Sequence, residues 1–389
     1  MIKLTMAKLA LNTLRHLFLI ISILLSVTYA ITPFVIEEQL LWESSDEGEV
    51  STYRIPIIKQ MPNGDLLAFS EARKYSSADA GAKFIAMRRS SNSGQSWGPS
   101  VFILNDYKVP DGLNLGTVLV DSITNNTMLI HTFCVHSVCN GTGQKASGVF
   151  MVTSPDFGYS WSEPVNLGEK NPKLMDLHFD PGPGYGIQKQ HPPHKGRLVT
   201  CGHADGANGA DERSMLCLHS DDGGVIWNIS MGLAGLPYGQ TKKTGDFVPG
   251  EVQIVELKNG TILANVRNTY NYHCKCRIQA MSFDGGSSFP TTSIQLKEEL
   301  LDPDVCGSLL NFNDNQYIFF SNAYSIVSRI NLTLHWSTDG GSTYPNLLNI
   351  YGKGSGYSCL TYVDKNHIAL VYEKDDIKFI SYVRIQLNL

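Results

Sequence analysis

The hydrophobic positions of this chain fall into short runs separated by turn residues. The runs are continuous or alternate with polar positions, which is typical of β-strands. Beyond residue 30, no long run has the 3.6-residue period of an amphipathic helix. The pattern therefore predicts an all-β fold. Representative runs are Gly148–Thr153, Thr261–Val266, Gln316–Ser321 and Ile368–Tyr372.

One stretch near the N-terminus predicts a complete β-hairpin. A strand over Tyr53–Ile58 is followed by a turn at Pro62–Gly64 and a second strand over Asp65–Phe69. Arg54 stands inside the first, apolar strand. An arginine in such a place is costly to desolvate unless it meets an anion, so on its own it is typical of a buried salt bridge.

A motif of the form Ser-x-Asp-x-Gly-x-x-aromatic recurs five times, with starts 64, 66, 62 and 55 residues apart. The residue types are those of a tight turn, because Asp caps backbone N–H groups and Gly adopts the positive φ that other residues avoid. Such a turn stabilises a fold and need not be a functional site. The copies are Ser90–Trp97, Ser154–Trp161, Ser220–Trp227, Ser282–Phe289 and Ser337–Tyr344.

The repeat spacing predicts a six-bladed β-propeller. A repeat of about 60 residues suits one four-stranded blade, and roughly 360 residues then give six blades. The sixth blade has no copy of the turn, so we expect both ends of the chain to close it. Phe34–Trp42 would pair with the C-terminal runs Ile368–Tyr372 and Phe379–Leu387, which removes the open edges of the ring.

Residues 1–30 have the layout of a cleavable secretory signal. Lys3, Lys8 and Arg15 precede the apolar run Leu17–Leu25, and small residues follow it as far as Ala30. A signal anchor is the alternative, although the run is short for a membrane span. We expect residues 31–389 to form a single propeller domain. Without the three basic residues of the leader, the formal net charge of −5 becomes −8, which disfavours nucleic acid as a partner.

Secretion agrees with the sequons and the cysteines. Eight cysteines form an even set whose pairing the sequence cannot assign. The cluster His273–Cys276 invites a metal interpretation, but no second cluster with zinc-type spacing accompanies it, so we expect no metal. Five sites fit Asn-x-Ser/Thr and are candidates for glycosylated surface loops: Asn125, Asn140, Asn228, Asn259 and Asn331.

Five such turns, together with Tyr53-Arg54-Ile55-Pro56, resemble the sialidases, which combine Asp-box turns with a Phe/Tyr-Arg-Ile-Pro motif. The resemblance covers nearly the whole chain after the leader, and within the family it is closest to the animal lysosomal sialidases. The turns alone are not specific, because other propellers also carry them. The specific runs are Glu71–Lys74, Gly81–Ala86, Val109–Gly116, Gly184–Gln190, Asn271–Arg277 and Asn331–Leu334.

The resemblance implies a site that binds the substrate's carboxylate. Sialic acid carries a carboxylate on the carbon that is attacked, and guanidinium groups can meet such an anion with two parallel hydrogen bonds. Arg54, Arg267 and Arg329 match the family's three arginines, and each belongs to a different predicted blade. Glu373 matches the acid that holds the first arginine, with a solvated charge at a strand end as the alternative.

The resemblance also implies the catalytic groups. Tyr357 matches the family's nucleophile, a neutral group that avoids the like-charge approach of a carboxylate to an anionic substrate. Glu251 matches its base, although Gly250 stands where relatives often have a polar residue. Asp79 matches the general acid and base, on a loop where an aspartate is otherwise an ordinary turn residue.

Arg73, Asp111 and the loop Gly182–Gly186 are expected to line the pocket towards the rest of the sugar. The implied activity is that of an exo-α-sialidase, which removes terminal sialic acids from glycoproteins, glycolipids and oligosaccharides with retention of configuration and without a cofactor. A sialic-acid-binding propeller without catalysis, such as a lectin, is one alternative. A trans-sialidase is another, but those enzymes typically add a lectin-like domain for which no residues remain.

The resemblance implies the lysosomal lumen, with secretion or the cell surface as alternatives. It also implies a partnership with the serine carboxypeptidase known as protective protein, and at most a peripheral membrane association. The C-terminus, Ile385–Leu389, lacks the tyrosine-based tail of lysosomal relatives, which puts sorting by that tail in doubt.

Overall fold

The computed structural model describes residues 31–45, 48–107, 112–133, 148–175, 178–204, 214–234, 248–269 and 272–389. Within them the chain forms 26 β-strands and three short 3₁₀ helices, η1 (Leu167–Glu169), η2 (Pro172–Leu174) and η3 (Thr291–Ser293). The predicted all-β fold is confirmed. The expected secretory leader, residues 1–30, lies outside the described residues.

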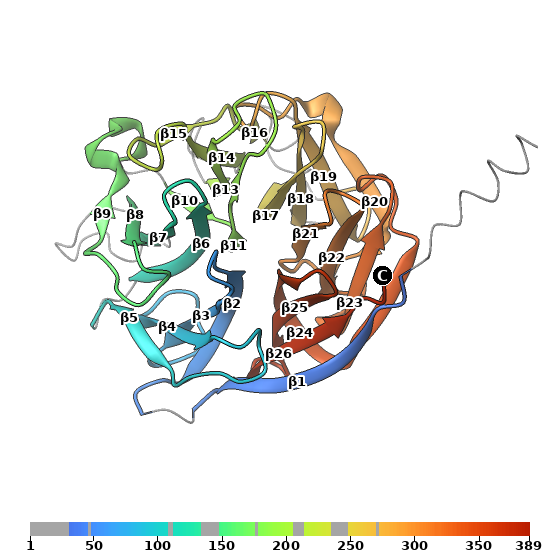
Figure 1. Cartoon of the computed structure of the whole chain (residues 1–389), viewed down its shortest axis with the longest axis horizontal. Coiled ribbons are helices and arrows are strands. Elements are labelled where there is room, and N and C mark those ends of the chain that lie inside the picture. The colour runs from blue at the N-terminus through green and yellow to red at the C-terminus, as the bar shows by residue number, and fades with distance from the viewer. Residues whose placement is uncertain are drawn as a thin grey trace, which may run out of the picture.

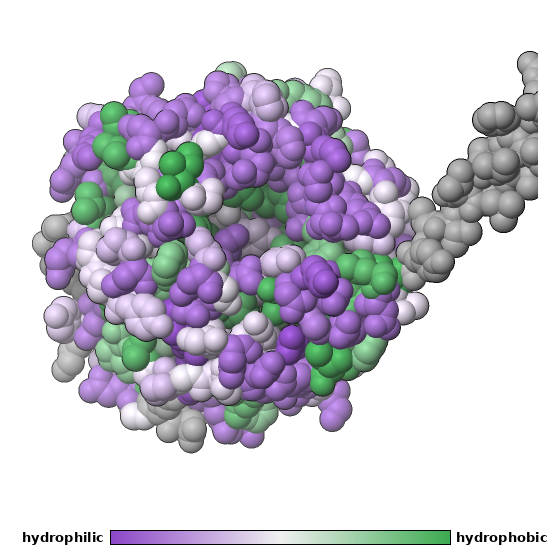
Figure 2. Space-filling model, viewed as in Figure 1, coloured by the Kyte–Doolittle hydropathy of each residue, from purple (hydrophilic) through white to green (hydrophobic). Residues whose placement is uncertain are grey.

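The described strands divide into six groups that stand around a common centre, as in a β-propeller (Figure 1). Figure 2 shows that the surface is hollowed near the middle of this ring. The first group contains β2 (Thr52–Gln60), β3 (Leu66–Arg73), β4 (Lys83–Ser90) and β5 (Val101–Asn105). The second contains β6 (Leu113–Asp121), β7 (Asn126–Phe133), β8 (Gly148–Ser154), β9 (Val165–Asn166) and β11 (Gly184–Tyr185). The third contains β10 (Phe179–Pro181), β12 (Ile187–Gln188), β13 (Leu198–Ala204), β14 (Ser214–Ser220), β15 (Asn228–Ile229) and β16 (Leu233–Ala234).

The remaining groups complete the ring, and one long strand belongs to two of them. β24 pairs with β23 through Asn346–Gly354 and with β25 through Ser355–Asp364, so it ends the fifth group and begins the sixth. The fourth group contains β17 (Val248–Glu256), β18 (Ile262–Thr269), β19 (Cys276–Ser282) and β20 (Gln295–Leu301). The fifth contains β21 (Ser308–Phe312), β22 (Tyr317–Ala323), β23 (Ile330–Ser337) and the first part of β24 (Asn346–Asp364). The sixth contains the second part of β24 with β25 (His367–Lys374), β26 (Phe379–Gln386) and β1 (Phe34–Glu43).

Both ends of the described chain close the ring, as predicted. β1 pairs antiparallel with β26, from Phe34 opposite Gln386 to Glu43 opposite Phe379, and β26 pairs with β25. β1 therefore forms the outer edge of the last blade (Figure 1). The outer edge is half exposed, whereas the eight residues of β3 are all buried. Apolar side chains of such buried strands form the core between neighbouring blades.

The five repeated turns have the structure that their residues predict. Each joins the third strand of a blade to the fourth. In every copy the Ser Oγ accepts a hydrogen bond from the Gly N–H at 2.6–2.9 Å and donates to the Asp or Asn Oδ1 at 2.6–2.9 Å. The glycines have φ between 84° and 89°, a region that disfavours other residues. The turns therefore stabilise the fold locally.

The structure shows how some of the cysteines are paired and how exposed four of the five sequon asparagines are. Disulfides join Cys201 to Cys217 and Cys274 to Cys276, so Cys274 and Cys276 do not offer free thiolates to a metal, whereas Cys306 and Cys359 are free and buried. The described residues contain no cluster of metal-ligating side chains and no helix long and apolar enough to cross a membrane. Asn125, Asn228 and Asn259 are exposed and Asn331 is half-buried, while Cys134, Cys139 and Asn140 lie outside the described residues.

Candidate active site

Irregular pairing of the inner strands brings the site residues into one pocket. β2 shifts register between Arg54 and Ile57, and β24 does so between Ser355 and Ser358. Equivalent shifts occur in β17 next to Glu251 and in β6 next to Leu115. A bulge of this kind bends the strand and redirects a side chain. Bulges in β2, β6, β17 and β24, one in each of four blades, therefore direct side chains into the same part of the ring.

The backbone at the first bulge is strained. Ile55 has a φ of 56°, which is unusual for a β-branched residue. In this conformation its N–H donates to Glu373 Oε1 at 3.1 Å. This backbone conformation therefore directs the N–H of Ile55 towards the buried carboxylate of Glu373.

Glu373, on β25, is the central buried acid of the site. Its side chain is 0% exposed and accepts hydrogen bonds from Arg54 Nε at 2.6 Å, Ile55 N at 3.1 Å and Tyr357 N at 3.1 Å. Burial alone would lower the pKa of Arg54, but the charge of Glu373 and its hydrogen bond raise that pKa above its usual value. Glu373 therefore fixes one arginine and the backbone of Tyr357 together.

Gly356 provides the space for this carboxylate. A Cβ at residue 356 would lie 2.1 Å from Glu373 Oε2. We expect Gly356→Ala to displace either Glu373 or the backbone next to Tyr357, and to lower kcat/KM about 10²-fold because the reacting groups move out of position. Gly340→Ala is the matched control, since its Cβ would meet nothing within 4 Å although its φ of 72° brings backbone strain. Near-normal kinetics in Gly356→Ala would contradict this role.

Tyr357 and Glu251 form a hydrogen-bonded pair at the axis, and Arg267 bonds to both. The Tyr357 hydroxyl donates to Glu251 Oε1, while Arg267 Nη1 donates to Glu251 Oε2 at 2.6 Å and to Tyr357 Oη at 3.1 Å. Burial would raise the pKa of Glu251, but the charge of Arg267 and these hydrogen bonds lower it to about 2. Burial and the charge of Glu251 raise the pKa of Tyr357 well above its usual value. The pair is therefore a carboxylate and a neutral phenol.

Three arginines from three blades converge on Tyr357. The guanidinium carbons of Arg54 and Arg329 lie 5.6 and 5.5 Å from the centroid of its ring, and Arg267 reaches its hydroxyl. Asp304 links two of them, because its Oδ1 accepts from Arg267 Nε at 2.5 Å and its carbonyl accepts from Arg329 Nη2 at 3.1 Å. Such a cluster can bind a carboxylate next to a neutral nucleophile.

A second charged group stands across the pocket. Arg73 Nη1 lies 2.9 Å from Asp79 Oδ1, and Arg73 Nε donates to Glu71 Oε2 at 2.9 Å. Glu71 is buried, and its other oxygen accepts from Leu115 N at 2.8 Å. The side chain of Asp79 is 67% exposed, so the loop carries it where a substrate could reach it.

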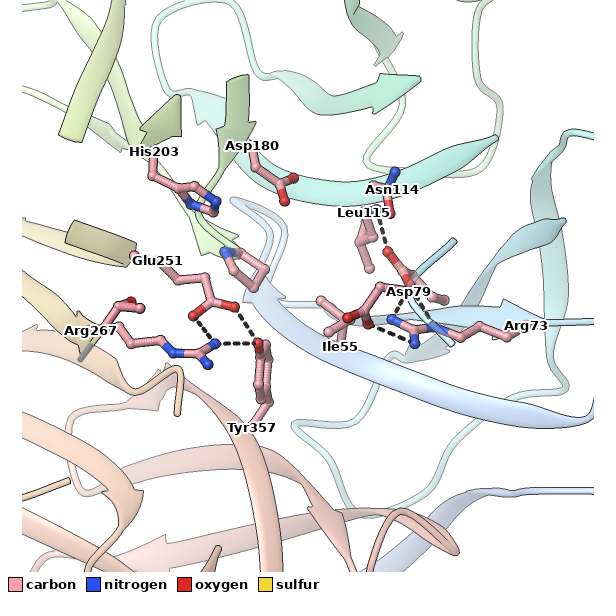
Figure 3. A pocket seen from close by; sticks show the side chains of 14 residues that line it. Ile55, Arg73, Asp79, Asn114, Leu115, Asp180, His203, Glu251, Arg267 and Tyr357 are labelled. Atoms are coloured by element: carbon pink, nitrogen blue, oxygen red, sulfur yellow. Dashed lines mark hydrogen bonds and ion pairs between the residues drawn. The ribbon is translucent and has the colours of Figure 1, made fainter. Parts of the chain in front are cut away.

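The pocket between these groups has a volume of about 270 Å³. Figure 3 shows Tyr357, Glu251 and Arg267 on one side and Arg73 with Asp79 on the other. Asp180 and His203, which are paired across β10 and β13, complete the wall above Glu251. This polar chamber suits a small anionic ligand with several hydroxyl groups.

The structure brings most of the predicted site residues together, as Arg54, Arg267, Arg329, Glu251, Tyr357 and Glu373 form one cluster, and Arg73 and Asp79 face it across the pocket. Asp111 lies outside the described residues.

The sequence assigned no role to two carboxylates, Glu71 and Asp304. Glu71 could have been found, because it is two residues from Arg73 on one strand and such residues share a face. Asp304, in a loop with a φ of 64°, has no such signal.

Known proteins resemble this chain in sequence and in fold. Residues 64–368 match the BNR repeat-like domain family. The sialidase of Micromonospora viridifaciens is 30% identical over 364 residues, which are 86% of this chain and 52% of that protein. Sialidase-3 of Bos taurus is 30% identical over 297 residues, 70% of this chain and 64% of that protein. This chain thus spans between about half and two thirds of the length of these relatives.

The fold is also similar to that of a solved structure. The intramolecular trans-sialidase from Ruminococcus gnavus, in complex with oseltamivir carboxylate, superposes with a TM-score of 0.72 at 16% identity. The superposition covers 91% of this chain and 99% of that one. At this identity the likeness concerns the fold alone.

Proposed function

This chain belongs to the BNR repeat-like domain family, as a relative of the sialidases named above, and on that premise we propose that it is an exo-α-sialidase. The observation that carries the proposal is the convergence of three arginines on a neutral tyrosine that is hydrogen-bonded to a carboxylate. The substrates would be terminal sialic acids on glycoproteins, glycolipids and oligosaccharides.

The residues divide the work of a retaining mechanism. Arg54, Arg267 and Arg329 bind the substrate carboxylate and set the anomeric carbon next to Tyr357. Glu251 takes the phenol proton as the bond from the tyrosine oxygen to the anomeric carbon forms and the bond to the leaving oxygen breaks. Asp79 gives a proton to that leaving oxygen, and a water then releases the sugar from Tyr357. No cofactor or metal takes part in this scheme.

The test is hydrolysis of a fluorogenic sialoside from about pH 3 to about pH 8, with NMR of the first sugar anomer released. We expect release of free α-sialic acid. Binding without turnover would favour a lectin. Transfer to added lactose in place of water would favour a trans-sialidase. A 2,7-anhydro product would favour an intramolecular trans-sialidase, the activity named for the Ruminococcus gnavus protein.

Asp79→Asn should slow natural sialosides by roughly 10²- to 10⁴-fold, the range for a general acid. Substrates with a phenol leaving group that needs little protonation should lose much less. Since Asp79 is paired with Arg73 before substrate binds, Arg73→Lys is a useful companion variant that keeps the charge and removes the planar donor pair. Equal losses of Asp79→Asn on both kinds of substrate would mean that Asp79 only shapes its loop.

The cellular setting is proposed on the resemblance alone. A leader at residues 1–30 would direct the chain to the secretory pathway, with the remaining residues as a single catalytic domain. The lysosomal lumen and the serine carboxypeptidase partner are the finer expectations. Microscopy of the tagged full-length chain and co-purification with the carboxypeptidase would test them separately.

A further inference from the structure

A second cavity lies at the opposite end of the ring axis from the candidate active site. Three of the strands next to the axis run from one cavity to the other. Each of them carries a residue of the active site and, five positions later, a residue that lines the second cavity. The pairs are Arg54 and Lys59 on β2, Glu251 and Glu256 on β17, and Tyr357 and Tyr362 on β24. In each strand the residue of the site lies at or next to the bulge, and the lining residue of the second cavity lies beyond the bulge, further along the same strand.

We name this space the distal cavity and define it by Lys59, Tyr185, Ile187, Gln188, Leu310 and Tyr362. Its volume is about 520 Å³. A neighbouring cavity of about 420 Å³ shares Lys59, Ile187 and Gln188 with it, so the two meet at Lys59. At about 3.3 Å per strand residue, Lys59 lies roughly 15 Å along β2 from Arg54, so the distal cavity is separate from the arginine cluster.

Lys59 is the unusual member of this lining. Its Nζ lies 4.4 Å from the centroid of the Tyr185 ring, and within the described residues it has no carboxylate partner. The Tyr185 hydroxyl is already engaged, because it donates to the carbonyl of Leu309. Burial lowers the pKa of Lys59 to about 8, with a small opposing effect from Cys359. An ammonium group kept half-buried without an anion is unfavourable, unless a ligand supplies the anion.

The carboxylates of the distal cavity do not meet this need. Glu256 accepts from Lys189 Nζ at 2.6 Å and from the backbone N–H groups of Gln190 and His191. Asp314 pairs with Lys258 at 2.9 Å on the exposed rim. The remaining wall is largely apolar, so the cavity combines one positive charge with aliphatic and aromatic surface.

We propose that the distal cavity binds a small organic monoanion. Its anionic group meets the Lys59 ammonium, and its apolar body lies against Tyr185, Ile187 and Leu310. This arrangement gives one charge-assisted hydrogen bond and an apolar surface for a ring or short alkyl chain. The proposal stands on the second cavity and does not require sialidase activity.

The test uses benzoate as the probe and calorimetry as the readout. Lys59→Met keeps the length of the side chain and removes the charge, so benzoate affinity should fall at least about tenfold, the effect of losing one charge-assisted hydrogen bond. Arg329→Met is the matched control, because it removes a cation from the arginine cluster and should leave this binding within about twofold. Binding that survives Lys59→Met but disappears in Arg329→Met would place benzoate at the arginine cluster and overturn the proposal, as would the absence of saturable binding.

A second measurement on the unaltered protein guards against misfolding of the Lys59 variant. Because Lys59 is charged below a pKa of about 8, benzoate affinity should be present at neutral pH and fall as the pH rises through that value. Tyr185 and Cys359 lie close to Lys59, and the other titratable residues of the lining are His191, Glu256, Asp314 and Tyr362. None of these groups gains positive charge as the pH rises. Benzoate should also protect Lys59 from acetylation, measured by peptide mass spectrometry. The exposed Lys258 is the internal control, and equal acetylation of both lysines with and without benzoate would contradict the proposal.

Discussion

Tyr357→Phe should retain sialic acid binding and lose at least about 10³-fold in turnover, the scale on which loss of a nucleophile reduces other covalent hydrolases. Arg54 and Arg329 lie beside the tyrosine ring, and a Phe ring preserves that surface. The change removes the hydroxyl that donates to Glu251 and accepts from Arg267, while Arg267 keeps its ion pair with Glu251. Because Tyr357 is neutral before reaction and Arg267 balances the charge of the ionised Glu251, the nucleophile adds no negative charge for the substrate anion to approach.

Mass spectrometry with a 3-fluorinated sialosyl fluoride is the direct readout. One sugar should be attached to the peptide that contains Tyr357 in the unaltered protein and none in Tyr357→Phe. Tyr351→Phe removes a hydroxyl from the same strand, where it donates to Asp375 away from the pocket, and should behave like the parent. A label on Glu251, or near-normal turnover of Tyr357→Phe, would require a different mechanism and a different role for Glu251.

Glu373→Gln should weaken both folding and activity. The change keeps the shape of the side chain but leaves Arg54, which is only 12% exposed, without its counter-charge. Breaking a buried ion pair in this way costs about 3–5 kcal/mol of unfolding free energy. Since the same carboxylate holds Arg54 and the Tyr357 backbone, kcat/KM should also fall about 10²-fold.

Denaturant unfolding and sialoside hydrolysis measure the two effects. Glu38→Gln is the matched control in the same blade, because Glu38 is 36% exposed and pairs with Lys374 at 2.7 Å. An exposed pair of this kind contributes about 1 kcal/mol or less. If Glu373→Gln matched Glu38→Gln in both measurements, Glu373 would not be the organising acid of the site.

The sequence predicted the features that depend on local chemistry. The hairpin of β2 and β3 follows from two short apolar runs on either side of a Pro62–Gly64 turn, and the five repeated turns follow from Ser, Asp and Gly at fixed spacing. The pairing of β1 with β26 followed from the need to cover an open edge. The members of the site came from resemblance to a family, because no periodicity relates residues as far apart as Arg54 and Glu373.

The remaining features depend on contacts that only the folded ring creates. No residue pattern marks the bulge that turns Glu251 inwards or the positive φ of Ile55. The position of Asp304 between two arginines depends on a loop from another blade. In the sequence Lys59 is an ordinary lysine at a strand end, and only the folded structure shows that its ammonium group lies over the ring of Tyr185.

The closure of the ring by its first and last strands has a consequence for how the molecule acquires activity during folding. Arg54 and Glu373 are separated by 319 residues, and Glu251 and Tyr357 by 106. Contacts of such long range are slow to form, because the chain entropy of a large loop is lost before the contact rewards it. Early blades can form their own hairpins and turns, but the catalytic groups meet only when the last blade docks. Enzymatic activity should therefore report on the final event of folding and lag behind the appearance of β-structure.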